Sequence, residues 1–231
     1  MKKTMLLMTM FLCILLLSSN AQAYQYGIKV GDRVKHTSSG PTGGGEFTMV
    51  ADYDEDDDVD YTWLSFCLER NENLYGNYDW VGGLTDSATQ GGVGGPSPDP
   101  LSDQSAWLYW NFWTGNLTNY TYGNDQDEAD LQSLIWYLED EQNSYNATAG
   151  GWLTDAQNAI TGSWTNNGRV KVANLYETRS GSPGAYIYSG DRQDVLVPGA
   201  PVPEPATMLL LGSGLIGLAG LGRKKFFKKS V

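Results

Sequence analysis

Few side chains in this 231-residue sequence are candidates for nucleophilic or metal chemistry. The cysteines are Cys13 and Cys67, and His36 is the one histidine. Nucleophilic hydrolases need a positioned base with an orienting third group, and zinc sites need several His or Cys ligands. Nothing ties His36 to a nucleophile, and no pair among the 27 acidic residues is singled out for glycoside hydrolysis. A hydrolase is therefore the least favoured interpretation, and no metal ligand is assigned.

The N-terminus has the pattern of a secretory signal peptide. Lys2 and Lys3 precede a short apolar run, and Ala21-Gln22-Ala23 places small residues where a signal peptidase cuts. An uncleaved anchor is the less favoured alternative. Cleavage before Tyr24 would leave Cys67 as the one cysteine of the exported chain.

A lone cysteine in an oxidising compartment is open to four interpretations. It is a buried inert thiol, half of an intermolecular disulfide, a reactive nucleophile, or a partner in a covalent bond to something other than sulfur. Cys67 lies in the stretch WLSFCLERN, residues 63–71, which is predicted to be part of an apolar strand. Composition does not choose among the four.

The C-terminus combines three features in a fixed order. Val202-Pro203-Glu204-Pro205 precedes an apolar segment, 206–222, and a basic end, 223–231. The segment is shorter than the roughly 20 residues of a comfortable membrane span, and basic residues after it stay cytoplasmic. This arrangement resembles the PEP-CTERM sorting signal, which implies an exosortase partner, a Gram-negative cell that makes exopolysaccharide, and transient anchoring in the inner membrane.

The body between the two ends is strongly acidic. The ends hold seven of the 15 basic residues and one acid, which leaves 8 Lys and Arg against 26 Asp and Glu. Nucleic acid is excluded as a partner because phosphate binding needs a basic face. Residues 52–60, DYDEDDDVD, are predicted to be a solvated acidic loop between two strands; they lack the mid-loop glycine and final glutamate of the helix-loop-helix calcium site.

The order of predicted elements is strands, then helices, then strands. Alternating apolar residues predict strands over 24–36, 46–52, 61–69, 169–177, 184–189 and 192–197, and residues 91–100 read as a loop. Helices are predicted after Ser102 or Asp103, after Asn124 or Asp125, and over 153–161. We therefore expect an α+β fold: mainly a β sandwich or barrel with an inserted small helical subdomain.

The second helix carries a further candidate residue. Leu131, Leu134, Ile135 and Leu138 form one apolar stripe, and Gln132 lies at its edge. The pattern Leu131-Gln132 followed by Ile135-Trp136-Tyr137, together with Phe66-Cys67-Leu68-Glu69 upstream, resembles the Cys-Gln thioester domain of bacterial surface adhesins. One departure is Leu131-Gln132-Ser133-Leu134 in place of the family's Thr-Gln-x-Ala.

The resemblance implies an internal thioester between Cys67 and Gln132. It also implies covalent attachment to an amine-bearing ligand, without a cofactor and without enzymatic turnover. The expected alternative is a non-covalent module associated with exopolysaccharide, at the cell surface or in the extracellular matrix. The expected segments are the signal peptide 1–23, the thioester-type domain 24–198, the linker with the Pro-Glu-Pro motif 199–205, the transient transmembrane segment 206–222 and the basic tail 223–231.

Overall fold

The computed structural model describes residues 24–38, 40 and 45–201. Among the described residues, Tyr26–Ala200 form one compact unit. The predicted signal peptide, the segment 206–222 and the basic tail lie outside the described residues. Within the described part of the chain, no helix is long and apolar enough to cross a membrane.

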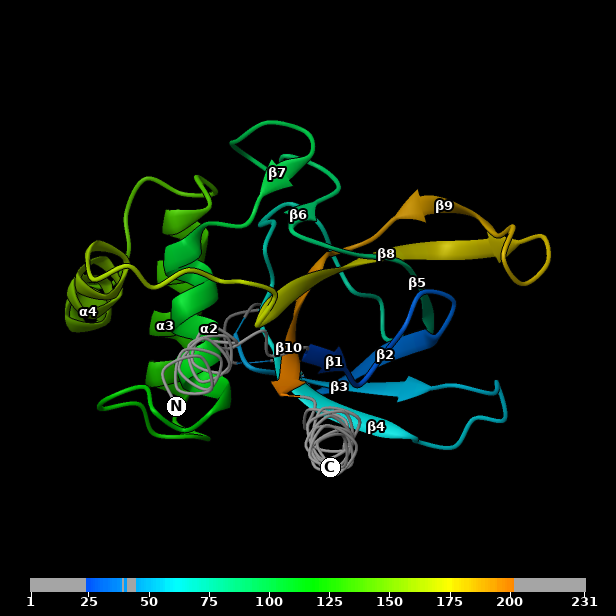
Figure 1. The fold of residues 1–231 in the computed structure, drawn as a ribbon, viewed down its shortest axis with the longest axis horizontal. Coiled ribbons are helices and arrows are strands. Elements are labelled where there is room, and N and C mark those ends of the chain that lie inside the picture. Colours follow the sequence, from blue (N-terminus) through cyan, green and yellow to red (C-terminus); the bar gives the residue numbers. More distant parts are fainter. Residues whose placement is uncertain (1–23, 39, 41–44, 202–231) are drawn as a thin grey trace, which may run out of the picture. The chain divides into compact units, whose positions relative to one another are not determined.

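The main sheet is an antiparallel half-barrel (Figure 1). Seven strands follow the order β1-β10-β8-β5-β2-β3-β4, and β9 pairs with the far part of β8. The strands are β1 Tyr24–Tyr26, β2 Arg33–Ser38, β3 Phe47–Asp52, β4 Tyr61–Ser65, β5 Asp79–Thr85, β8 Val170–Ser180, β9 Ile187–Asp191 and β10 Val195–Pro201; β6 Ser87–Ala88 and β7 Asp99–Pro100 form a separate pair.

Three α-helices are inserted between β7 and β8, as the change of period predicts. They are α2 Asp103–Trp113, α3 Asp125–Leu138 and α4 Gly150–Thr161, the last preceded by the short 3-10 helix η1 Ala147–Ala149. Side-chain caps fix two of the starts. The Ser102 hydroxyl accepts from the main-chain N–H of Ser105, and the side-chain Oδ1 of Asn124 accepts from the main-chain N–H groups of Gln126 and Asp127. The α+β expectation is confirmed, in its barrel form.

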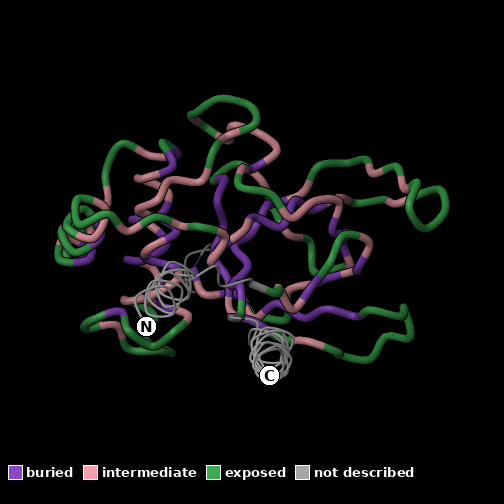
Figure 2. Tube along the Cα trace, in the orientation of Figure 1, coloured by how far each residue is buried: buried purple, intermediate pink, exposed green. Residues whose placement is uncertain are grey.

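Two apolar clusters divide the interior. One joins the helices to the outward side of the strands, through residues such as Phe66, Leu108 and Leu196. The other fills the half-barrel and includes Trp63, Cys67 and Val195. Neighbouring residues alternate between the clusters, as expected for extended chain. Figure 2 shows the buried backbone running through the strands and onto the adjoining helices.

Two expectations about the strands are wrong in detail. Residues 24–36 are not one strand, because Gly31 has φ +101° and a turn separates β1 from β2. The strand predicted over 61–69 ends at Ser65, and Cys67 lies beyond it in an isolated bridge with Val195. The chain there exchanges one pairing partner, β3, for another, β10.

Candidate functional site

Main-chain hydrogen bonds hold Cys67 beside β10. The N–H of Leu68 donates to Asp194 O at 3.2 Å, and the N–H of Leu196 donates to Phe66 O at 3.3 Å. The Cys67 residue is 4% exposed, and its thiol is free. The segment that carries the sulfur is therefore fixed to the sheet on both sides of Cys67.

Helix α3 carries Gln132 among its buried residues. Leu131, Leu134 and Ile135 are fully buried, as the stripe predicts, and Leu138 is half-buried. Gln132 itself is 0% exposed, so it lies inside the buried face rather than at its edge. A buried amide needs hydrogen-bond partners for both its oxygen and its nitrogen.

Those partners are the main chain of Cys67. The N–H of Cys67 donates to Gln132 Oε1 at 2.9 Å, and Gln132 Nε2 donates to the carbonyl oxygen of Cys67 at 2.9 Å. The two residues are 65 positions apart in the sequence. The structure thus brings together the two residues that the thioester resemblance singles out, and rotation about the Cα–Cβ bond of Cys67 then sets the distance between sulfur and the amide carbon.

Gly45 is a third member of this contact, and its role is not predicted from the sequence. Its N–H donates to Gln132 Oε1 at 3.0 Å. Its φ of +111° lies in a region that side-chain-bearing residues rarely adopt. In the sequence Gly45 is one glycine of a glycine-rich run. The run indicates only that an unusual backbone conformation is possible there, and it does not single out Gly45.

The electrostatic surroundings keep the sulfur protonated. Burial, and then the charge of Glu69, raises the pKa of the Cys67 thiol well above its usual value. Burial and the charge of Asp194 raise the pKa of Glu69, whose Oε2 accepts from Asp194 N at 3.1 Å. Glu69 Oε1 is buried and has no hydrogen-bond partner among the described residues. The site is buried and favours the neutral thiol over the thiolate.

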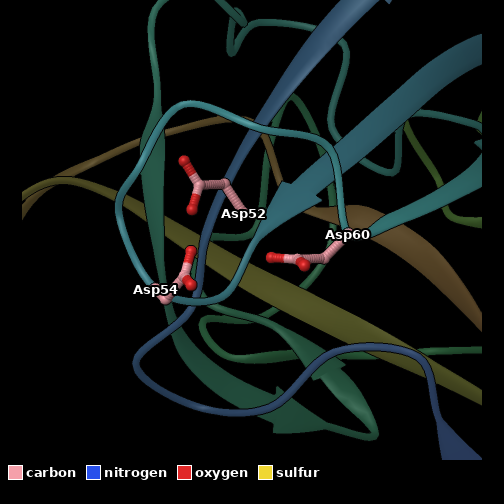
Figure 3. A group of neighbouring side chains, drawn as sticks. All are labelled: Asp52, Asp54 and Asp60. Atoms are coloured by element: carbon pink, nitrogen blue, oxygen red, sulfur yellow. The ribbon is translucent and has the colours of Figure 1, made fainter.

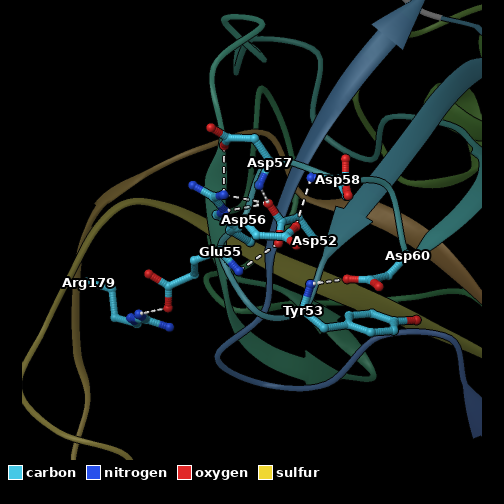
Figure 4. A network of polar contacts seen from close by, with 9 residues as sticks. Asp52, Tyr53, Glu55, Asp56, Asp57, Asp58, Asp60 and Arg179 are labelled. Carbon is cyan, nitrogen blue, oxygen red and sulfur yellow. Dashed lines mark hydrogen bonds and ion pairs between the residues drawn. The ribbon is translucent and has the colours of Figure 1, made fainter.

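The acidic stretch 52–60 connects β3 to β4, and residues 53–60 are exposed as predicted. Carboxylate oxygens of Asp52, Asp54 and Asp60 lie within 4.8 Å of one another (Figure 3). Asp52, by contrast, is buried and pairs with Arg33 at 2.5 Å. Main-chain N–H groups of the loop also donate to Asp52 and Asp60 (Figure 4).

These contacts explain the ionisation of Asp52. Burial acts to raise its pKa, but the hydrogen bonds from Arg33 and from the main chain of the loop lower it overall. The charge of Asp52 is therefore balanced by the protein's own groups. The cluster is accounted for as the structural anchor of the loop, and no cation is assigned to it.

A cavity of about 480 Å³ lies away from Cys67, at the β8–β9 hairpin. This volume is within the range of small-molecule sites. Tyr188 lines the cavity, and its hydroxyl is buried without a hydrogen-bond partner among the described residues. The aromatic and charged side chains of the lining are Lys29, Asp32, Tyr53, Glu55, Arg179, Tyr186 and Tyr188.

Comparison with known proteins bears on one end of the chain. Residues 201–224 match the family described as the PEP-CTERM protein-sorting motif. Searches of the curated proteins and of the solved structures found no match. The match includes the predicted motif Val202-Pro203-Glu204-Pro205 and does not extend into residues 24–200, so it gives no support for a thioester domain.

The motif defines the class of the protein by its destination. This chain carries a PEP-CTERM signal, which implies an exported protein that is sorted to the cell surface with an exosortase as its processing partner. The motif says nothing about what the body between the two ends does.

Proposed function

We propose that this exported protein forms an internal thioester between Cys67 and Gln132 and uses it to attach covalently to an amine-bearing ligand at the cell surface or in the extracellular matrix. The observation that carries the proposal is the pair of hydrogen bonds, each 2.9 Å long, between the Gln132 amide and the main chain of Cys67. A reaction between groups held in this way is effectively intramolecular.

The chemistry balances without a cofactor. Cys67 Sγ attacks the amide carbon of Gln132, the C–S bond forms, the C–N bond breaks, and the thiol proton leaves with the nitrogen as ammonia. A ligand amine later attacks the same carbon, so that an amide bond forms and the amine proton passes to sulfur. Each molecule reacts once, and the protein is not a turnover enzyme.

Burial supports the survival of such a bond. A thioester is an activated acyl group that water hydrolyses, and an enclosed site protects it. Gln132 is fully buried and Cys67 nearly so. Trp63, on the adjoining strand, belongs to the same apolar cluster as Cys67.

Capture of a small amine tests the proposal. Because the site is buried, methylamine is the appropriate probe. Incubation of the folded protein is expected to add one methylamine at Gln132 and to release one titratable thiol at Cys67, both located by peptide mass spectrometry. Cys67→Ala should take up none. Gln132→Glu, which has almost the same shape, should keep the fold and also take up none.

Two results would count against the proposal. One is a folded wild-type protein that incorporates no methylamine. The other is incorporation at Gln132 in Cys67→Ala at the wild-type rate, which would show a reaction that does not pass through sulfur.

A second candidate function is non-covalent binding of exopolysaccharide at the cavity beside the β8–β9 hairpin. The favouring observation is the tyrosine-rich lining, because tyrosine combines an apolar ring with a polar hydroxyl. Retention of Cys67→Ala on the producing cell's polysaccharide separates the two functions. Undiminished retention favours the cavity, and lost retention favours the thioester.

A further inference from the structure

We propose that the main-chain N–H groups of Gly45 and Cys67 form an oxyanion site for the carbonyl group of Gln132, and that this site accelerates both formation of the thioester and its attack by an amine. The inference rests on the proposed function, since it concerns the same acyl carbon. It adds Gly45 as a catalytic group, acting through its N–H.

The geometry is that of a two-donor oxyanion site. The N–H of Cys67 is 2.9 Å and that of Gly45 3.0 Å from Gln132 Oε1. Such donors lie about 2.7–3.1 Å from the oxygen that becomes negative in acyl transfer. The donors come from separate places, one before β3 and one after β4, so the fold assembles the pair.

The orientation of the amide is set by its surroundings. Gln132 Nε2 faces the carbonyl oxygen of Cys67, which can only accept a hydrogen bond. Gln132 Oε1 faces two N–H groups, which can only donate. The atom aimed at the two donors is therefore the oxygen on which negative charge develops.

The oxyanion site lowers the barrier to attack by a weak nucleophile, the buried thiol. A protonated sulfur is a poor nucleophile, and burial raises the pKa of Cys67. When sulfur adds to the amide carbon, the carbonyl π pair moves to Oε1 and the C–S bond forms. Two fixed N–H dipoles in a buried site stabilise that charge at no cost of reorganisation. When the pair returns during thioester formation, the C–N bond breaks and the thiol proton leaves with the nitrogen as ammonia. When the pair returns during attack by an amine, the C–S bond breaks and the amine proton passes to sulfur.

Gly45 is suited to this role by its backbone conformation rather than by lack of space. A Cβ at Gly45 would lie 3.6 Å from Glu128 O and from Gly40 Cα, which is ordinary contact. Its φ of +111°, however, strains any residue with a side chain. Gly45→Ala is thus expected to turn the peptide plane and to move the N–H away from Oε1.

The test compares Gly45→Ala with a matched control. Gly115 also has a positive φ, +71°, with nothing within 4 Å of its Cβ position, and it is exposed in the turn that follows α2. The rate of methylamine addition is measured by mass spectrometry for wild type, Gly45→Ala and Gly115→Ala. Loss of one oxyanion donor typically costs about 100- to 1,000-fold, so we expect Gly45→Ala to be slower by at least about tenfold and Gly115→Ala to match wild type.

A spectroscopic readout separates catalysis from structure. With ¹³C-labelled glutamine, the infrared stretch of the thioester carbonyl in wild type should lie below that of a simple alkyl thioester that carries the same ¹³C label in hydrocarbon solvent, and it should rise in Gly45→Ala. If Gly45→Ala does not fold, the carbonyl frequency of the wild type decides whether the carbonyl accepts hydrogen bonds as proposed.

The outcomes distinguish the two proposals. No methylamine uptake by wild type overturns the thioester itself. Uptake by wild type, with an unshifted carbonyl frequency or with an unchanged rate in folded Gly45→Ala, overturns the oxyanion site and leaves the thioester standing. A slower rate and a raised carbonyl frequency in Gly45→Ala, with the control variant unchanged, support both the thioester and the oxyanion site.

Discussion

Opening the thioester with methylamine is expected to lower the free energy of unfolding by about 4 kcal/mol, the chain-entropy value for a cross-link between residues 65 positions apart. The reason is that a covalent bond between Cys67 and Gln132 restricts the unfolded chain in the same way as a disulfide. Cleavage restores that freedom while leaving the folded contacts almost unchanged.

The measurement is guanidinium denaturation before and after treatment. The midpoint should fall in the treated wild-type protein. Cys67→Ala, given the same treatment, serves as the control and should show no change. An identical midpoint for treated and untreated wild type would mean that no cross-link was present to open.

Gln132→Ala, made in a Cys67→Ala background where no thioester forms, is expected to cost about 3 kcal/mol or more, because each buried group left without a partner costs about 1–3 kcal/mol. The groups affected are the N–H of Gly45 and the N–H and carbonyl of residue 67. This prediction concerns the hydrogen bonds alone and is independent of the covalent chemistry.

Gln132→Glu in the same background is the matched variant. It keeps two side-chain oxygens in nearly the same volume, and its neutral form can also donate to the carbonyl of residue 67. Its loss should be clearly smaller than that of Gln132→Ala. Equal losses, or a loss below 1 kcal/mol for the alanine variant, would contradict the hydrogen-bonded contact described here.

Much of the fold follows from local sequence signals. Strand β3 and the helices α2 and α3 lie where alternation, the apolar stripe and the caps predict them, and β4 begins at Tyr61 as predicted but ends earlier, at Ser65. The caps are Ser102 and Asn124, one from each pair of alternatives. These signals are local because each depends on a period or on a hydrogen bond within one turn.

Strand β5, Asp79–Thr85, was not predicted, and its glycines give the reason. Gly82 and Gly83 interrupt the alternation that marks a strand. A Cβ at Gly82 would come within 2.5 Å of the Tyr176 ring, and one at Gly83 within 2.7 Å of Asn174 Oδ1. Neighbours on β8 therefore require the glycines, and that requirement comes from tertiary packing that the local sequence does not encode.

The residues of the candidate site also differ in how far the sequence reveals them. Cys67 and Gln132 have side chains whose chemistry can be recognised in a motif, and the fold places them in contact. Gly45 acts through a main-chain N–H, which every residue except proline possesses, so residue type alone does not reveal it. The buried carboxyl of Asp194 was missed for a different reason, since its burial depends on partners from Thr89 and Asn174.

The most direct test of the central claim is the intact mass of the purified exported protein. The termini of the mature chain are determined first, and the measured mass is compared with the mass calculated for the sequence between them. A thioester between Cys67 and Gln132 predicts a mass short by one ammonia, with no thiol titrating in the native state. Cys67→Ala and Gln132→Ala should each show the full mass calculated for the variant. A wild-type mass with nothing missing would contradict the thioester.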